Sequence, residues 1–275
     1  MMYRSMVMRP ALFSLAIMIA LPVCIAQRNH STTSVSAVPA SRIVPPSPSF
    51  HFPESETFVY SVEWHALNAG TATVIMQRSS SVEHLRAVAN TSGVVNKLYA
   101  VRDTFDADIE PGTFCTQQIS KHSEEGSRRI ERKVRFNYQI AKSHMDENDL
   151  KTGNKRQADV DIPPCVTDVV SGFFYASSLN LAPGSSQMFP VSDGGKTTDV
   201  KIEVEGRNRI KVPIGEFDAV RIKAEPVSGP LKDKGVLWVW FSDDARHIPL
   251  QMKSKLGFAT LLFQLRRMDL PSTAK

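Results

Sequence analysis

The sequence predicts a mainly β protein, built as a single curved antiparallel sheet or an open β-barrel-like domain with one or two short helices. Three observations predict this class. Many short segments alternate apolar and polar residues, turn residues separate them, and only two segments have helical spacing. Strands of this kind are half-buried, with one face on a core and the other in water. Residues 50–270 are long enough for one such domain.

The N-terminal residues 1–26 have the three parts of a secretory signal peptide. Arg4 and Arg9 precede an apolar run, Ala11–Ala26, that ends in a small residue suited to signal peptidase. The run is shorter than the roughly 20 residues that span a bilayer, so we expect cleavage rather than a retained anchor. No other stretch approaches transmembrane length. A lipidated Cys24 is an alternative, although Val23 stands where lipoproteins carry a smaller residue.

The signal peptide predicts an exported protein, in the periplasm or at the outer-membrane periphery of a bacterium. Residues 27–49 are rich in Ser, Thr and Pro and end in Val44-Pro-Pro-Ser-Pro-Ser49. Such a segment has too little apolar surface to offset the entropy of ordering it, so we predict a disordered linker. The folded domain is expected to begin near Phe50.

Period-two alternation predicts the strands in chain order. The first strand places four apolar residues on one face: Phe58, Tyr60, Val62 and Trp64. A turn at Asn68-Ala-Gly70 is expected to lead into its partner strand, and further alternating strands are predicted over 130–138, 200–205 and 220–225. Asp193-Gly194 and Gly206-Arg-Asn208 are predicted tight turns.

Helical spacing occurs over 93–100 and over 167–179. In the second segment Thr167 can cap the helix, and Asp168 favours its positive N-terminal end. The predicted buried stripe of this helix comprises Val169, Val170, Phe173 and Phe174.

One strand, Val236-Leu-Trp-Val-Trp-Phe241, is apolar on both faces and must therefore be covered on both. The ordinary explanation is that the 167–179 helix packs on it. The alternative is that a curved sheet holds an apolar molecule on its concave face. Under that alternative the candidate ligand-binding residues are Trp238, Trp240, Phe173 and Phe174.

Cys115 and Cys165 remain after removal of the leader and are an even pair in an oxidising compartment. A disulfide and two buried free thiols are both compatible with the sequence. Neither cysteine has a nearby Cys or His at ligand spacing, so we predict no metal site and no cofactor. Removing Arg4 and Arg9 lowers the formal net charge from +5 to +3, a weak charge that argues against nucleic-acid binding.

The sequence contains few catalytic signatures. Gly195-Lys-Thr197 resembles the end of a phosphate-binding loop but lacks its first glycine, because Pro190 stands there. Asp243 and Asp244 precede His247, an arrangement that invites acid–base chemistry, although Ser242-Asp-Asp-Ala245 is also typical of a turn. The weak catalytic candidates are Asp168, Asp243, Asp244 and His247.

Four phrases occur in register along the chain. They are Phe58-Val-Tyr-Ser-Val-Glu-Trp64, Asp168-Val-Val-Ser-Gly-Phe-Phe-Tyr175, Val212-Pro-Ile-Gly-Glu-Phe-Asp-Ala-Val-Arg221 and Trp238-Val-Trp-Phe-Ser-Asp-Asp244. In order and spacing they resemble the domain-of-unknown-function 3108 (DUF3108) family of exported bacterial proteins, over about 52–267. The resemblance implies an envelope location and a β-rich curved sheet, comparable with the open barrels of periplasmic lipoprotein carriers. It carries over no reaction, cofactor or catalytic residue.

Together these features predict an exported cell-envelope protein that binds an apolar or amphiphilic component, such as a lipid, or a partner protein, without catalysis. The alternative is a periplasmic hydrolase acting on cell-wall or polysaccharide material, in which Asp168, Asp243, Asp244 and His247 would meet in a cleft. That alternative requires the groups to converge within about 10 Å. A scaffold for envelope assembly is a third possibility.

Overall fold

The structure, a computed structural model, describes residues 41–46, 50, 55–79, 82–229, 232, 235–256 and 259–269. These residues belong to one compact unit, Pro39–Lys275. The predicted signal peptide, Cys24 and residues 27–40 of the predicted linker lie outside the described residues. In the part of the chain that is described, no helix is long and apolar enough to cross a membrane.

The fold is mainly β, as predicted, and consists of one antiparallel sheet of 14 strands that does not close into a barrel. The order across the sheet is β8-β7-β6-β5-β4-β3-β2-β1-β14-β13-β12-β11-β10-β9. In chain order the strands are β1 (Glu56–Trp64), β2 (Leu67–Arg78), β3 (Glu83–Thr91), β4 (Val101–Ile109), β5 (Thr116–Glu125), β6 (Arg128–Asn137), β7 (Lys142–Asp149), β8 (Lys155–Asp161), β9 (Ser186–Ser192), β10 (Thr197–Val212), β11 (Gly215–Pro226), β12 (Gly235–Ser242), β13 (Pro249–Leu256) and β14 (Ala259–Asp269).

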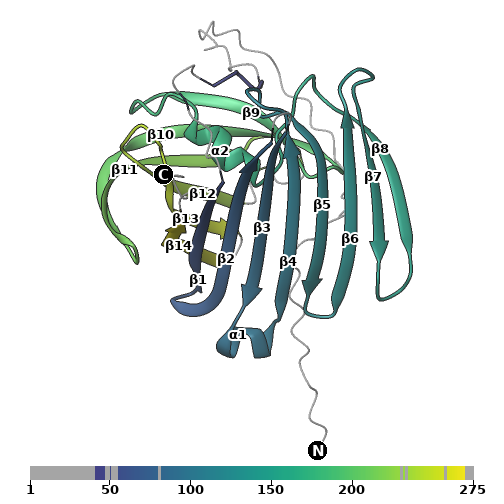
Figure 1. Ribbon diagram of the computed structural model, residues 1–275, viewed down its shortest axis with the longest axis horizontal. Helices are drawn as coiled ribbons and strands as arrows, with labels where there is room; N and C mark the ends of the chain where they lie inside the picture. The colour runs from purple at the N-terminus through teal and green to yellow at the C-terminus, as the bar shows by residue number, and fades with distance from the viewer. Residues whose placement is uncertain are drawn as a thin grey trace, which may run out of the picture. The chain divides into compact units, whose positions relative to one another are not determined.

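Two meanders make up the sheet, because every strand pairs with its neighbours in sequence except β8 and β9, which lie at opposite edges. The β1–β14 pair joins the two meanders. The strands of the two meanders run in crossed directions, β1–β8 roughly vertical and β9–β13 roughly horizontal in Figure 1. The chain passes from β8 to β9 through α2 (Ser171–Ser177). One core cluster contains residues of both meanders and of α2, so the curved sheet and the helix share a core.

The helices are shorter than predicted. α1 (Gly93–Leu98) lies within the predicted 93–100 segment, and α2 occupies only the middle of 167–179. Thr167 does not cap α2, because it forms a parallel bridge with Val191 of β9. The Asp168 carboxylate accepts the Val170 and Ser171 N–H groups in its place, both through Oδ1 at 2.9 and 2.8 Å. Val169 was expected in the buried stripe, but it is 53% exposed.

Two predicted turns are wrong. The β1–β2 hairpin turns at His65 and Ala66, both with positive φ, and Asn68-Ala-Gly70 lies within β2. Gly206 lies inside β10, where the register against β11 shifts and φ is +153°, so it forms a bulge. Asp193-Gly194 does connect β9 and β10.

Part of the predicted linker packs on the domain. The Arg42 N–H donates to the Met188 carbonyl of β9 at 3.1 Å, and the Val44 N–H donates to the Tyr175 hydroxyl at 2.8 Å. Ile43 packs against the core cluster. Residues 41–46 therefore form part of the folded unit, because apolar Ile43 and these backbone bonds compensate for the entropy of ordering the segment.

Candidate functional site

Cross-strand pairing separates the two faces of the sheet, because directly paired residues project to the same side. Phe58 contacts Phe174 of α2, with ring centroids 5.9 Å apart. The helix therefore covers the face that Phe58 shares with Tyr60 and Val62. Val62 pairs with Phe263, Phe263 with Met252, and Met252 with Val239 of β12. We call this side the inner face and the opposite side the outer face.

Trp238 and Trp240 alternate with Val239 and therefore lie on the outer face, away from α2. Trp238 pairs with Lys223 and Lys253, and the Arg221 guanidinium lies 6.0 Å from the Trp240 ring. The concave-face position that the sequence suggested for these two residues is wrong. Trp240 is 9% exposed and is counted in the core cluster, and Trp238 is half-buried and packs against that cluster.

Phe173 and Phe174 come from α2, as expected. Phe174 is 3% exposed and belongs to the core cluster, whereas Phe173 is half-buried and packs against it. The helix also approaches β13. The helix thus packs against the sheet, and Phe174 is a core residue. A role of Phe173 in ligand binding stays a prediction.

The inner face carries apolar side chains that are only partly buried. They lie on β1, β12, β13 and β14, and each is half-buried: Val62, Trp64, Leu237, Met252, Leu261 and Phe263. Leu237, Met252 and Phe263 also pack against the core cluster. Polar side chains alternate with them on the outer face, for example Gln251 beside Met252 and Gln264 beside Phe263. This part of the inner face is a continuous apolar surface that remains partly accessible.

One row of side chains on the inner face becomes charged on strands β5–β8. One ladder row runs from Met268 through Phe58, Val74, Ala87 and Phe105, and continues through Lys121, Arg132, Glu147 and Arg156. The change falls between β4 and β5. Along this row the inner face is therefore amphipathic, apolar on β14 and β1–β4 and charged on β5–β8, whereas a neighbouring row on the same face of β5–β7 holds the buried apolar Ile119, Val134 and Met145.

Ion pairs organise the charged half. Lys121 Nζ lies 3.7 Å from Asp103 Oδ2 and 3.9 Å from Glu125 Oε1. Arg132 Nε donates to Glu147 Oε2 at 2.8 Å, and Arg132 Nη1 lies 3.6 Å from Asp193 Oδ2. Burial raises the pKa of the Glu125 carboxyl, and the neighbouring Asp103 carboxylate raises it further.

A buried hydroxyl without a partner lies among these charges. Ser123 pairs directly with Asp103, is 3% exposed, and its Oγ has no hydrogen-bond partner among the described residues. Buried hydroxyls are usually satisfied by protein or ordered water. Ser123 is therefore a buried hydroxyl whose hydrogen-bonding capacity is not used by the described residues.

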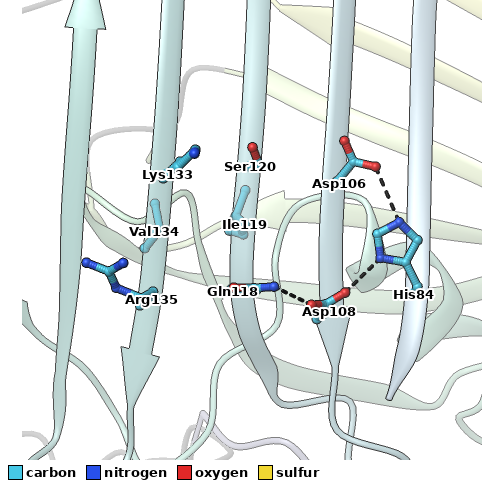
Figure 2. Close-up of a pocket in the computed structure, with 9 residues that line it drawn as sticks. All are labelled: His84, Asp106, Asp108, Gln118, Ile119, Ser120, Lys133, Val134 and Arg135. Carbon is cyan, nitrogen blue, oxygen red and sulfur yellow. Dashed lines mark hydrogen bonds and ion pairs between the residues drawn. The ribbon is translucent and has the colours of Figure 1, made fainter. Parts of the chain in front are cut away.

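A second polar cluster lies on the outer face of β3–β6, around a hollow of about 270 Å³ (Figure 2). His84 Nδ1 lies 2.7 Å from Asp108 Oδ1, and His84 Nε2 lies 3.3 Å from Asp106 Oδ1. The Gln118 amide donates to the second oxygen of Asp108. Ser120, Lys133 and Arg135 complete the polar lining.

The hollow lacks the geometry of nucleophilic catalysis. Ser120 would have to be the nucleophile, and its base would have to accept the hydroxyl proton. Both ring nitrogens of His84 face carboxylates instead, so neither is available to Ser120. The arrangement is suited to a solvated network of charges across neighbouring strands.

Of the four weak catalytic candidates, Asp243, Asp244 and His247 share the β12–β13 turn, whereas Asp168 lies at the opposite end of α2 from His247. Asp168 is fully buried at the start of α2, and the His247 ring contacts the Ser177 carbonyl at the end of that helix, at 2.7 Å. Asp243 pairs with Arg207 at 2.8 Å, and Asp244 accepts the Ser242 hydroxyl and the Arg246 N–H. These contacts form the β12–β13 turn, as the turn interpretation of Ser242–Ala245 anticipated.

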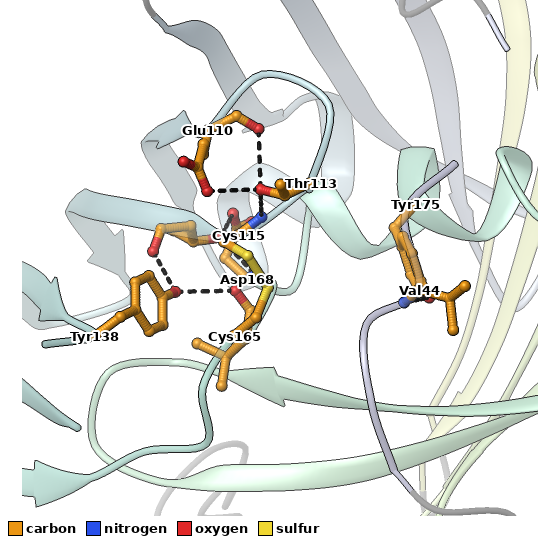
Figure 3. The surroundings of a disulfide bond; sticks show 10 residues. Val44, Glu110, Thr113, Cys115, Tyr138, Cys165, Asp168 and Tyr175 are labelled. Carbon is orange, nitrogen blue, oxygen red and sulfur yellow. Dashed lines mark hydrogen bonds between the residues drawn. A yellow bond between two sulfur atoms is a disulfide. The ribbon is translucent and has the colours of Figure 1, made fainter. Parts of the chain in front are cut away.

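Cys115 and Cys165 are joined by a disulfide, with Cα atoms 5.2 Å apart (Figure 3). Beside the bond, the Thr116 N–H donates to the Val166 carbonyl at 2.9 Å, and the Tyr138 hydroxyl donates to the Thr116 carbonyl at 2.6 Å. The disulfide therefore attaches the start of β5 to the segment that leads into α2. Within the described residues, no cluster of three or more His, Cys, Asp or Glu side chains could hold a metal ion.

Replacing Asp159 with Asn should lower the pKa of His144. The Asp159 carboxylate lies 2.8 Å from His144 Nδ1, and this hydrogen bond is the main cause that raises the His144 pKa. Since the raised pKa favours the imidazolium in the folded state, any stabilisation is present at low pH and is lost as pH rises through that pKa. An NMR titration of the imidazole protons measures the change, with Asp161→Asn as the matched control. An unchanged His144 pKa in Asp159→Asn would contradict this assignment.

The fold defines a class of β-rich domain in which one open, curved antiparallel sheet packs a short helix on its inner face. The sequence matches the family described as "Protein of unknown function (DUF3108)" over residues 59–266. This chain belongs to that family. A comparison with curated proteins found no match.

Among solved structures, the chain is similar to a β-barrel-like protein of the DUF1849 family from Brucella abortus. The TM-score is 0.56 at 8% identity, covering 84% of this chain and 100% of that one. This likeness supports the fold alone. Weaker matches are a Bacteroides fragilis protein described as exported with a YmcC-like fold (TM-score 0.35, 8% identity) and a Parabacteroides distasonis protein described as a lipoprotein (TM-score 0.33, 10% identity). Each covers 84% of this chain and 100% of its own.

Proposed function

We propose that this chain is an exported envelope protein that binds an amphiphile on the inner face of its sheet without catalysing a reaction. The observation that carries the proposal is the change from apolar to charged side chains along the row of that face that runs from Phe58 to Arg132. The acyl chain of the ligand would lie against Met252, Phe263 and their half-buried neighbours. Its polar head would lie near Lys121 and Arg132.

Energetic arguments favour an amphiphile over a wholly apolar ligand. Each buried methylene of an acyl chain contributes about 0.8 kcal/mol, so the apolar half suits a long hydrocarbon. A wholly apolar ligand that extended over β5–β7 would bury Lys121 and Arg132 without adding hydrogen bonds, which is unfavourable. A polar head would instead meet the ion-paired Lys121 and Arg132 side chains. Export is supported by the signal-peptide pattern of residues 1–26.

Met252→Lys should weaken the uptake of a fluorescent fatty acid about tenfold or more, because it places a charge on the apolar half of the inner face. Gln251→Lys is the matched control, since it makes the same change one residue away on the outer face of β13. Fluorescence titration measures both variants. Native mass spectrometry of protein purified after export should also show bound lipid.

Two results would count against amphiphile binding. One is exported protein that carries no lipid and takes up no fatty acid. The other is equal loss of uptake in Met252→Lys and Gln251→Lys, which would place the bound probe elsewhere. A circular dichroism melt of each variant establishes that the comparison is made between folded proteins.

A further inference from the structure

The two edge strands of the sheet differ in whether other parts of the chain cover them. The edge strand β9 is covered, because its Met188 carbonyl accepts the Arg42 N–H and its Val191 bridges to Thr167. The other edge strand, β8, has no partner on its outer side among the described residues, and it borders the sheet in Figure 1. An exposed edge presents unpaired N–H and C=O groups to another strand.

The hydrogen-bond pattern shows which β8 residues present those groups. The Asp149 N–H donates to the Asn154 carbonyl at 2.8 Å, and the Ile162 N–H donates to the Ala141 carbonyl at 3.0 Å. In an antiparallel pair such bonded positions recur at every second residue. The even-numbered residues of β8 therefore face β7. Four residues direct their backbone groups outward: Lys155, Gln157, Asp159 and Asp161.

Charges on β8 are divided between its two ends. Lys155 and Arg156 begin the strand, whereas Asp159 and Asp161 end it. Charges normally protect an edge because like charges meet when two copies approach. Like charges would repel in a parallel pairing of two β8 strands, because Lys155 of one copy would lie beside Lys155 of the other. In antiparallel pairing, the basic end of one copy meets the acidic end of the other.

The outward residues select one register. With a two-fold axis at Ala158, Lys155 lies opposite Asp161 and Gln157 lies opposite Asp159 of the second copy. All four outward residues then occupy hydrogen-bonded positions on both strands. Moving the axis to Gln157 leaves Asp161 without a partner in β8, and moving it to Asp159 brings two copies of that carboxylate together.

We propose that two copies of this chain dimerise by antiparallel pairing of their β8 strands about Ala158. The pairing joins the two sheets edge to edge, with a Lys155–Asp161 ion pair at each end. It does not depend on the proposed ligand, because β8 lies at the far edge from the apolar strands β12–β14.

Sedimentation velocity of the full chain, purified as the host exports it, tests the dimer over about 1–200 µM, a range suited to a small one-strand interface. Gln157→Pro should raise the dimer dissociation constant about tenfold or more. It removes one outward donor from each copy and leaves the backbone bonds between β8 and β7 intact, while the Gln157 side-chain bond to Asp146 is lost in this variant and in Gln157→Ala alike. Gln157→Ala keeps the N–H and should remain dimeric. Circular dichroism melts check that both variants are folded.

Charge reversal gives a second test of the register. Lys155→Asp should weaken the dimer, because it places two acidic groups together at each end. Adding Asp161→Lys to the same chain should restore the dimer, since the opposite charges again face each other. A wild-type chain that remains monomeric throughout the concentration range overturns the proposal. So does a dimer that neither Gln157→Pro nor Lys155→Asp weakens.

Discussion

Replacing both Cys115 and Cys165 with Ser should lower the free energy of unfolding by about 4 kcal/mol. The disulfide closes a chain separation of 50 residues, which restricts the unfolded chain. Its loss also releases the start of β5 from the segment that leads into α2, where Thr116 bonds Val166 and Asp168. Urea unfolding followed by tryptophan fluorescence measures the change.

Reduced wild-type protein is the matched control for the Cys115→Ser, Cys165→Ser variant. Both lack the cross-link, so the two should unfold at similar urea concentrations, well below oxidised wild type. A loss smaller than about 1 kcal/mol in the double variant would mean that the unfolded chain gains little freedom. Since the bond lies remote from Met252 and Gln251 in the sequence, those variants should respond to reduction as the wild type does.

Alternation in the sequence predicted β1, β2, β6, β10 and β11, because each of these has one face on the core, but it did not locate β3–β5 or β7–β9. The turns were harder to predict. Asn68-Ala-Gly70 has the composition of a turn, but the chain reverses at His65 and Ala66, neither of which is a glycine. Gly206 was taken for a turn glycine, although a bulge inside a long strand requires the same residue. Composition does not distinguish these cases.

The row of apolar and charged side chains on the inner face could not be predicted from any one strand, because it depends on how the strands pair. Arg132 lies between Ile130 and Val134 in the alternation, so period two alone places it on the core face of β6. The sequence therefore carried this signal for Arg132. The outer-face position of Trp238 and Trp240 could not be predicted from alternation, because β12 is apolar on both sides. Only the register through β13 and β14 to Phe58 decides which side α2 covers.

Asp168→Ala should lower the free energy of unfolding by about 3–5 kcal/mol. The carboxylate is fully buried and accepts hydrogen bonds from the Val170 and Ser171 N–H groups and from the Thr116 and Ser171 hydroxyls. Removing it leaves these donors unsatisfied at the start of α2. Asp168→Asn keeps one acceptor oxygen and should cost less, about 1–2 kcal/mol. Urea unfolding at neutral pH measures both.

The pH dependence of Asp168→Asn separates the charge of this residue from its shape. Burial raises the Asp168 pKa, against the opposing effect of the hydrogen bonds from Ser171 and Thr116. Because the folded pKa lies above the unfolded value, the native state keeps a proton that the unfolded chain has lost. The Asp168 contribution to stability therefore declines as pH rises from the unfolded pKa to the folded pKa, and is constant above it. Asn does not titrate, so the difference in unfolding free energy between wild type and Asp168→Asn should shrink across that interval. A difference that stays constant from pH 4 to pH 8 would contradict the raised pKa of Asp168. The stability lost in Asp168→Ala would still measure the hydrogen bonds that the carboxylate accepts at the start of α2.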